Sequence, residues 1–122
     1  CRPDDEVWIL FGDGSVGYAL AEFDTFARHK IPDIAVVGND AGWSQIARDQ
    51  VKILHDDIGT VLERSDYHEV AAALGGQGVL LQQAEHVGSS LEQARQAAAS
   101  GAPVLLNVWL DKTDFREGSL SV

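Results

Sequence analysis

The sequence contains no methionine and one cysteine among its 122 residues, and it begins Cys1-Arg2-Pro3. Because an open reading frame starts with methionine, we expect a fragment of a longer enzyme. A single cysteine can form neither an internal disulfide nor a metal-thiolate cluster, so nothing indicates an oxidising compartment. No apolar run approaches the roughly 18 residues that span a bilayer, and no signal peptide is visible in these residues.

Basic side chains are also scarce, with 9 Lys and Arg against 19 Asp and Glu, for a formal charge of -10. They are spread from Arg2 to Arg116, whereas contacts to nucleic-acid phosphates require clusters of Lys and Arg. We therefore expect no nucleic-acid partner, and the acidic balance suits a protein that meets cations. A hydrophobic fraction of 45% in a chain of this length is sufficient for a buried core.

Short apolar runs alternate with stretches of helical periodicity. The apolar runs predict strands over residues 7–11, 34–37, 78–81 and 104–110, and the periodic stretches predict helices over 16–27, 43–50, 67–74 and 89–99. Unbroken apolar runs are typical of parallel strands that are buried on both faces. We predict one α/β domain over residues 1–122, a three-layer α/β/α arrangement around a mostly parallel sheet.

Helix boundaries and irregular stretches are predicted less directly. Asp66 has the position of an N-cap, and Ser89 with Glu92 has the spacing of a capping box. Residues 51–65 have no clear period, and the polar tail over 111–122 is predicted to be an irregular arm against another surface.

The turn after the first predicted strand matches the dinucleotide fingerprint G-x-G-x-x-G over residues 12–17, between a strand and a helix. Asp40 follows the second strand, where such domains place the acid that binds a ribose. However, Asp13 lies inside the fingerprint, and a carboxylate about 4 Å from a pyrophosphate is repelled by several kcal/mol at an effective dielectric near 20. A divalent cation between the two groups removes this repulsion.

A cation at this turn has further oxygen ligands within reach. Asp40 follows Asp13 by one strand-helix-strand crossover, so both carboxylates are expected at the same edge of the sheet. Mg²⁺ prefers carboxylate, phosphate, carbonyl and water oxygens, and Gly42 offers a backbone carbonyl. The backbone amides of Gly14 and Ser15, with the Ser15 hydroxyl, are expected to bind phosphate oxygens at the helix N-terminus. These residues predict a Mg²⁺-bridged diphosphate.

The segment Gly12-Asp13-Gly14-Ser15, together with Asn39-Asp40, resembles the G-D-G-(S/A)…N-N signature of thiamine diphosphate enzymes. Residues 66–75 and 102–108 are similar to other parts of the family's C-terminal diphosphate-binding domain. The resemblance implies thiamine diphosphate and Mg²⁺ as cofactors, with Asp13, Asp40 and the Gly42 carbonyl as metal ligands. It also implies that Gly12, Gly14, Ser15 and Trp43 contact the cofactor. Asp40 stands where the family commonly has Asn and adds a negative charge.

Several segments are similar to the acetolactate-synthase-like branch, whose animal member is a 2-hydroxyacyl-CoA lyase. They are residues 22–26, 28–32, 38–43 and 113–119. This resemblance implies a carbon-carbon lyase or carboligase that acts on a 2-hydroxyacyl-CoA, giving formyl-CoA and an aldehyde one carbon shorter, or on a 2-oxo acid. It further implies a homodimer or homotetramer, because the activating glutamate comes from the partner subunit's N-terminal domain; the chain alone is then inactive. Animal relatives in this branch are associated with the endoplasmic reticulum membrane.

Alternatives to the thiamine diphosphate hypothesis remain at this point. The first is a Rossmann-type dinucleotide-binding domain of an oxidoreductase, with Asp40 on the ribose and no metal. The second is a domain that serves only assembly. Trp43, Ser44 and Gln45 also have two interpretations, because they either face the thiazolium ring or the substrate, or simply pack the loop.

Overall fold

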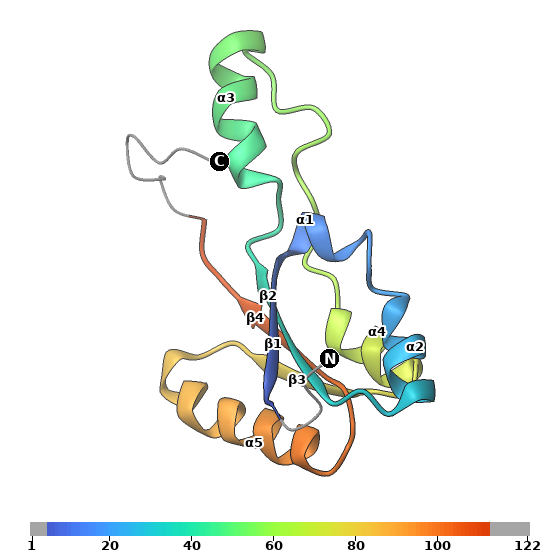
Figure 1. Ribbon diagram of the computed structural model, residues 1–122. Coiled ribbons are helices and arrows are strands. Elements are labelled where there is room, and N and C mark those ends of the chain that lie inside the picture. The colour runs from blue at the N-terminus through green and yellow to red at the C-terminus, as the bar shows by residue number, and fades with distance from the viewer. Residues whose placement is uncertain (1–4, 113–122) are drawn as a thin grey trace.

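The computed structural model describes residues 5–112 (Figure 1). The predicted arm over 111–122 and the similar segment 113–119 therefore lie largely or wholly outside the described residues. The elements are β1 (Val7–Gly12), α1 (Asp13–Val16), α2 (Glu22–His29), β2 (Asp33–Asn39), α3 (Ser44–Leu54), α4 (Tyr67–Ala73), β3 (Gln77–Leu81), the 3₁₀ helix η1 (Ala84–His86), α5 (Val87–Ala99) and β4 (Val104–Trp109). The four strands pair in parallel in the order β1-β2-β4-β3, which confirms the predicted α/β class.

Helices cover both faces of the sheet, as the three-layer prediction requires. Residues of β2 alternate between the two cores, with Ile34 in the cluster beneath α5 and Ala35 in the cluster that includes Val16, Phe23 and Ala71. The first cluster is built against α5 and the second against α1, α2 and α4. Each parallel strand in the middle of the sheet is thus buried on both sides, which explains its unbroken apolar run.

The prediction that the first strand is buried on both faces is wrong. Among the strands of residues 5–112, β1 lies at the edge of the sheet, and Leu10 is 78% exposed and Val7 47% exposed. Trp8 and Leu10 pair with Ile34 and Val36, so they lie on the α5 face of the sheet. α5 packs mainly on β2, β3 and β4, and therefore leaves this part of the face open.

Two helix predictions also need correction. The predicted helix over 16–27 is divided, because α1 ends at Val16 and α2 begins at Glu22, with turn hydrogen bonds between them. α5 begins at Val87, and the Ser89 hydroxyl donates to the carbonyl of His86, so the predicted capping box does not form. Asp66 is the N-cap residue of α4 as predicted, although its side chain makes no capping hydrogen bond.

Asp33, at the start of β2, is a buried carboxyl whose two oxygens have no hydrogen-bond partner within the described residues. Asp33 is 2% exposed, and this burial raises the pKa of its carboxyl to about 6. The folded protein therefore holds the proton more tightly than the unfolded chain. Stability from this group is fully present below the unfolded pKa of about 4 and is lost as the pH rises through the folded pKa of about 6.

We expect Asp33→Asn to remove this pH dependence. The quantity to compare is the free energy of unfolding of the variant minus that of the original chain. This difference should be about 2 kcal/mol larger at pH 7 than at pH 4, because only the original chain must bury a charge at neutral pH. Urea unfolding at both pH values measures the difference. Asp24→Asn, which changes an exposed acid, is the matched control and should show little of this rise. An equal rise in both variants would contradict the assignment.

Candidate functional site

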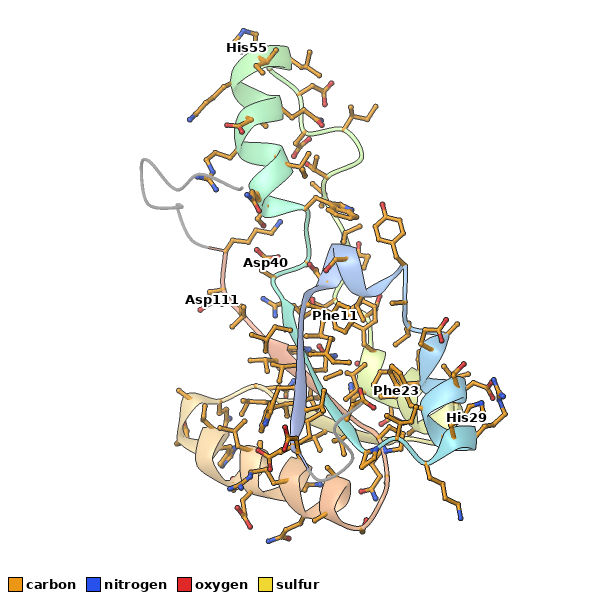
Figure 2. All side chains as sticks on the ribbon, viewed as in Figure 1. Phe11, Phe23, His29, Asp40, His55 and Asp111 are labelled. Atoms are coloured by element: carbon orange, nitrogen blue, oxygen red, sulfur yellow. The ribbon has the colours of Figure 1, made fainter. Side chains whose placement is uncertain are left out.

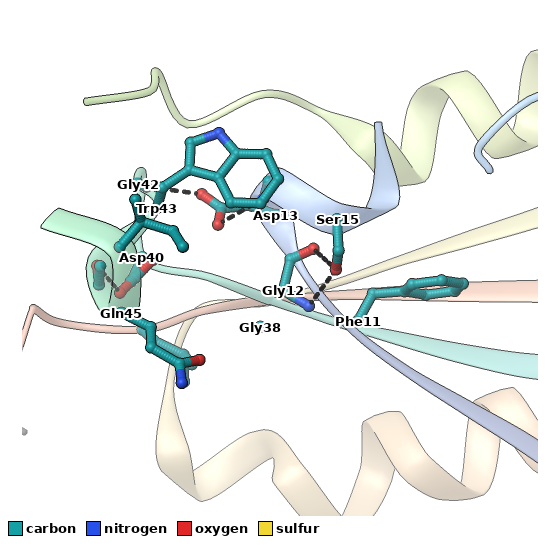
Figure 3. Close-up of a pocket in the computed structure, with 13 residues that line it drawn as sticks. Phe11, Gly12, Asp13, Ser15, Gly38, Asp40, Gly42, Trp43 and Gln45 are labelled. Atoms are coloured by element: carbon teal, nitrogen blue, oxygen red, sulfur yellow. Dashed lines mark hydrogen bonds between the residues drawn. The ribbon is translucent and has the colours of Figure 1, made fainter. Parts of the chain in front are cut away.

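The carboxyl ends of β1 and β2 lie side by side, because Gly12 pairs with Gly38 in the parallel ladder. Asp13 and Asp40 follow these strands and line one cavity of about 450 Å³ (Figure 3). Its lining consists of Phe11, Gly12, Asp13, Gly14, Ser15, Gly38, Asp40, Gly42, Trp43, Ser44, Gln45, Ile46 and Leu110. The structure thus brings together all seven residues that the sequence predicts around the cofactor, while their individual roles stay predictions.

Asp13 is the most buried polar residue of this cavity, at 2% exposed. Its Oδ1 accepts from the amide of Gly14 at 2.9 Å, and its Oδ2 accepts from the amide of Gly42 at 2.9 Å (Figure 3). Burial raises the pKa of Asp13, the two amides lower it, and the charge of nearby Asp40 raises it again. The carboxylate is therefore held in place at a position where a positive charge would stabilise it.

Asp40 lies across the cavity at the start of a tight turn. Its Oδ2 accepts a short hydrogen bond from the Ser44 hydroxyl, from the first turn of α3. Ala41 has a left-handed backbone with φ of 59°, which reverses the chain and turns the amide of Gly42 toward Asp13. The sequence predicts that Gly42 acts through its carbonyl, and the structure shows in addition that its amide joins the two strand ends.

Trp43 packs directly on the turn after β1. A β-carbon on Gly14 would lie 2.6 Å from ring carbons Cδ2 and Cε2 of Trp43. Glycine, which has no β-carbon, avoids this clash. The indole is also 6.0 Å from the ring of Tyr18, centroid to centroid. Trp43 thus packs the turn and also lines the cavity, so its predicted contact with the cofactor stays a prediction.

The Ser15 hydroxyl is engaged within its own turn. It donates to the carbonyl of Gly12 at 2.9 Å and accepts from the amide of Gly12 at 3.0 Å. This pair fixes the entry into α1. The sequence predicts that this hydroxyl binds a phosphate oxygen. To do so, the hydroxyl would have to give up or share its hydrogen bond to the Gly12 carbonyl.

Two residues near the site escape the sequence analysis. The Tyr67 hydroxyl donates to the carbonyl of Asp13 at 3.3 Å from the first turn of α4. The Lys112 ammonium lies 3.8 Å from where a β-carbon on Gly42 would be, so it brings a positive charge to the turn after β2. Tyr67 lies in the similar segment 66–75, but nothing in the sequence indicates a contact with the turn after β1, and only the fold brings both residues to this edge of the sheet.

The donor set of the cavity suits a hard divalent cation. No group of three or more His, Cys, Asp or Glu side chains converges anywhere within residues 5–112, so a soft-metal site is absent from this part of the chain. Two carboxylates with backbone carbonyls, completed by phosphate or water, are the ligands that Mg²⁺ takes in proteins. Asp13 is buried, and burial together with the charge of nearby Asp40 raises its pKa, so a cation would stabilise its charged form.

The geometry argues against the dinucleotide alternative. In doubly wound dinucleotide domains, the fingerprint turn opens a full helix on which the pyrophosphate lies. Here α1 has only 4 residues before the chain turns away. The match to the fingerprint letters therefore does not extend to its structural context.

Comparison with known proteins gives a consistent result. Residues 1–108 match the family described as thiamine pyrophosphate enzyme, C-terminal TPP binding domain. The chain is 52% identical to human 2-hydroxyacyl-CoA lyase 2 over its whole length, and 33% identical over 90% of its length to an acetolactate synthase large subunit of Mycobacterium tuberculosis. It spans about a fifth of each relative, 20% in both cases.

A solved structure is similar in fold as well. The thiamine diphosphate-dependent 4-hydroxybenzoylformate decarboxylase of Rhodococcus jostii superposes with a TM-score of 0.79 and 28% identity, covering 89% of this chain and 20% of that one. Within the described residues, no helix has the length and apolar character needed to cross a membrane.

Proposed function

The chain belongs to the thiamine pyrophosphate enzyme family, within its C-terminal TPP binding domain, and on this premise we propose that it binds the diphosphate of thiamine diphosphate through Mg²⁺. The observation that carries the proposal is the buried carboxylate of Asp13, held by two amides beside Asp40 at the ends of two parallel strands. Such a pair of acids in a cavity is stabilised by a cation, and the cation in turn attracts a diphosphate.

The roles of the individual residues follow from their chemistry. Asp13, Asp40 and the Gly42 carbonyl would hold Mg²⁺, and the amides of Gly14 and Ser15 would bind phosphate oxygens. Asp40 brings one more negative charge than Asn, which the amides at the start of α1 would have to offset. When bound, the cofactor supplies a nucleophilic carbon and stabilises the charge left by cleavage of a carbon-carbon bond.

The cavity lacks a group for proton transfer among its described lining residues. Asp13 and Asp40 are the acids that line it, and both are assigned to the cation. We infer that a residue from outside the described part of the chain completes the site. The family resemblance assigns this role to a glutamate of the partner subunit, so the longer protein is proposed to act as a homodimer or a larger oligomer.

The exposure of helix α3 is further evidence for a partner beside the site. α3 extends away from the sheet, with Asp40 near its base and His55 at its far end, and none of its residues is buried (Figures 1 and 2). Its apolar side chains Ile46, Val51, Ile53 and Leu54 are between 43% and 74% exposed. A helix of this length without tertiary packing is marginal in water, so a partner surface is expected to cover it.

We expect Leu54→Ser in the longer protein to weaken self-association. Loss of one buried leucine side chain from the interface should raise the dissociation constant of the dimer about tenfold or more. Sedimentation velocity over a dilution series measures it. Lys52→Ser on the same helix is the control and should leave the dissociation constant unchanged. An unchanged value for Leu54→Ser would remove α3 from the proposed interface.

For the reaction, we propose cleavage of a 2-hydroxyacyl-CoA into formyl-CoA and an aldehyde one carbon shorter. The support is the high identity to a protein named 2-hydroxyacyl-CoA lyase 2, compared with the lower identity to acetolactate synthase. The longer protein should be incubated separately with a 2-hydroxy fatty acyl-CoA and with a 2-oxo acid. Formation of formyl-CoA and the aldehyde supports the lyase proposal, whereas release of CO₂ from the 2-oxo acid alone, with formation of a condensed product, would replace it with a carboligase.

A further inference from the structure

A network of polar side chains lies buried directly beneath the turn that carries Asp40 and Gly42. Asn39 and Asn107 are both 0% exposed, and His68 is 8% exposed. The Asn39 Nδ2 donates to the Asn107 Oδ1 at 3.2 Å and to the carbonyl of Ser65 at 3.2 Å. The Asn107 Nδ2 donates to the same Ser65 carbonyl at 3.0 Å and lies 3.3 Å from His68 Nδ1. The network joins the ends of β2 and β4 to the start of α4.

The surroundings of Asn107 allow only one orientation of its amide. With Nδ2 toward the Ser65 carbonyl and His68 Nδ1, and Oδ1 toward Asn39, every contact pairs a donor with an acceptor. A flipped amide would place two oxygens against each other at Ser65 and two amino groups against each other at Asn39. His68 Nδ1 is therefore the acceptor, and Asn107 holds the Asn39 side chain in a single orientation.

Asn39 is hydrogen-bonded to the turn that follows it. Its Oδ1 accepts from the amide of Ala41 at 3.3 Å, which supports the left-handed residue between Asp40 and Gly42. Its carbonyl accepts from the amide of Leu110 at 2.9 Å and from Arg64 Nη1 at 3.1 Å. Through these bonds, side chain and backbone of Asn39 are both fixed immediately before Asp40.

Core stability alone gives no reason for such a network. Two buried amides that satisfy each other contribute little net stability, and a well-packed apolar pair of the same shape would serve the core equally well. What the amides add is direction, because hydrogen bonds orient a turn more specifically than apolar contacts do. In metal sites, residues that orient the ligands affect metal affinity by about 10-fold to 100-fold.

We propose that Asn107 is a positioning residue for the cation site, which it serves by orienting Asn39 and thereby the turn that presents Asp40 and Gly42. The inference rests on the proposed function, since it assumes that these two residues hold Mg²⁺. Asn107 itself lines no part of the cavity described above, and it acts only through Asn39.

The test is Asn107→Leu in the longer protein, with Mg²⁺ binding measured by isothermal titration calorimetry at saturating thiamine diphosphate, and with activity followed in parallel against Mg²⁺ concentration. The half-saturating Mg²⁺ concentration should rise about 10-fold to 100-fold. At saturating Mg²⁺, kcat should stay within about threefold of the original value, because Asn107 touches no reacting group. The matched control is Leu106→Val, a change at the neighbouring residue of β4 that lies in the core cluster under α5.

A second variant covers the case in which Asn107→Leu fails to fold. His68→Leu removes the acceptor that fixes the Asn107 amide, and it should raise the half-saturating Mg²⁺ concentration in the same direction by about threefold to tenfold. A Mg²⁺ response equal to that of the original protein in the folded variants, or an equal shift in Leu106→Val, would overturn the positioning role. An original protein that shows no Mg²⁺ dependence would overturn the proposed function itself.

Discussion

Replacing Asp13 by alanine in the longer protein should abolish Mg²⁺-dependent binding of thiamine diphosphate and lower activity by more than about 100-fold. Residues that merely orient metal ligands contribute about 10-fold to 100-fold in affinity or activity, and a direct ligand should contribute more. The buried Asp13 carboxylate also accepts a hydrogen bond from the Gly42 amide, so its loss removes a contact that holds the turn after β2 in place. Isothermal titration calorimetry with thiamine diphosphate and Mg²⁺, together with a product assay, measures both effects.

Two controls separate the metal role of Asp13 from a structural one. Asp13→Asn retains the size of the side chain and an acceptor for the Gly42 amide, but removes the charge and leaves the Gly14 amide facing the Asn Nδ2; it should fold with a modest loss of stability and still bind Mg²⁺ poorly. Asp24→Ala removes an exposed acid of α2 and should leave binding unchanged. Normal activity of the folded Asp13→Ala protein would show that the metal assignment is wrong.

Gly78→Ala should have the largest effect on stability, because α4 crosses β3 in direct backbone contact at this residue. A β-carbon on Gly78 would lie 2.2 Å from the carbonyl oxygen of His68 and 2.7 Å from its carbonyl carbon. Backbone atoms of a packed helix cannot move aside as a flexible side chain can. We therefore expect a loss of about 3 kcal/mol or more in the free energy of unfolding, at the upper end for overpacked cores.

Chemical denaturation followed by circular dichroism measures this loss. Gly88→Ala is the matched control, because a β-carbon there meets no other atom within 4 Å and the residue lies within α5. The control should be neutral or stabilising by up to about 1 kcal/mol, since alanine is the better helix former. Equal stability of the two variants would contradict the close approach of α4 to β3.

The candidate site was predictable from the sequence because its residues follow local rules. Asp13 and Asp40 each come directly after an apolar run, and one crossover places the ends of neighbouring parallel strands together. The exposure of Leu10 was not predictable, because an apolar run does not reveal whether its strand is central or at an edge of the sheet. The division of the predicted helix over 16–27 was missed for a similar reason, since Val16 and Phe23 keep a helical spacing while contacting one core.

The contacts between distant parts of the chain were beyond sequence reasoning. The bond between Asn39 and Asn107 joins residues 68 positions apart, and neither amide has a spacing or a neighbour that indicates the other. Tyr67 reaches the backbone of Asp13 across 54 positions in the same way. Such pairs depend on strand order and helix placement, so they become visible only once the fold is known.

The measurement that tests the central claim most directly is calorimetric titration of the longer protein with thiamine diphosphate, in the presence of Mg²⁺ and again after chelation. Parallel titrations with a nicotinamide and a flavin dinucleotide complete the experiment. We predict binding of thiamine diphosphate that requires Mg²⁺ and no binding of either dinucleotide. Dinucleotide binding that persists in the chelator, without Mg²⁺-dependent binding of thiamine diphosphate, would contradict the account.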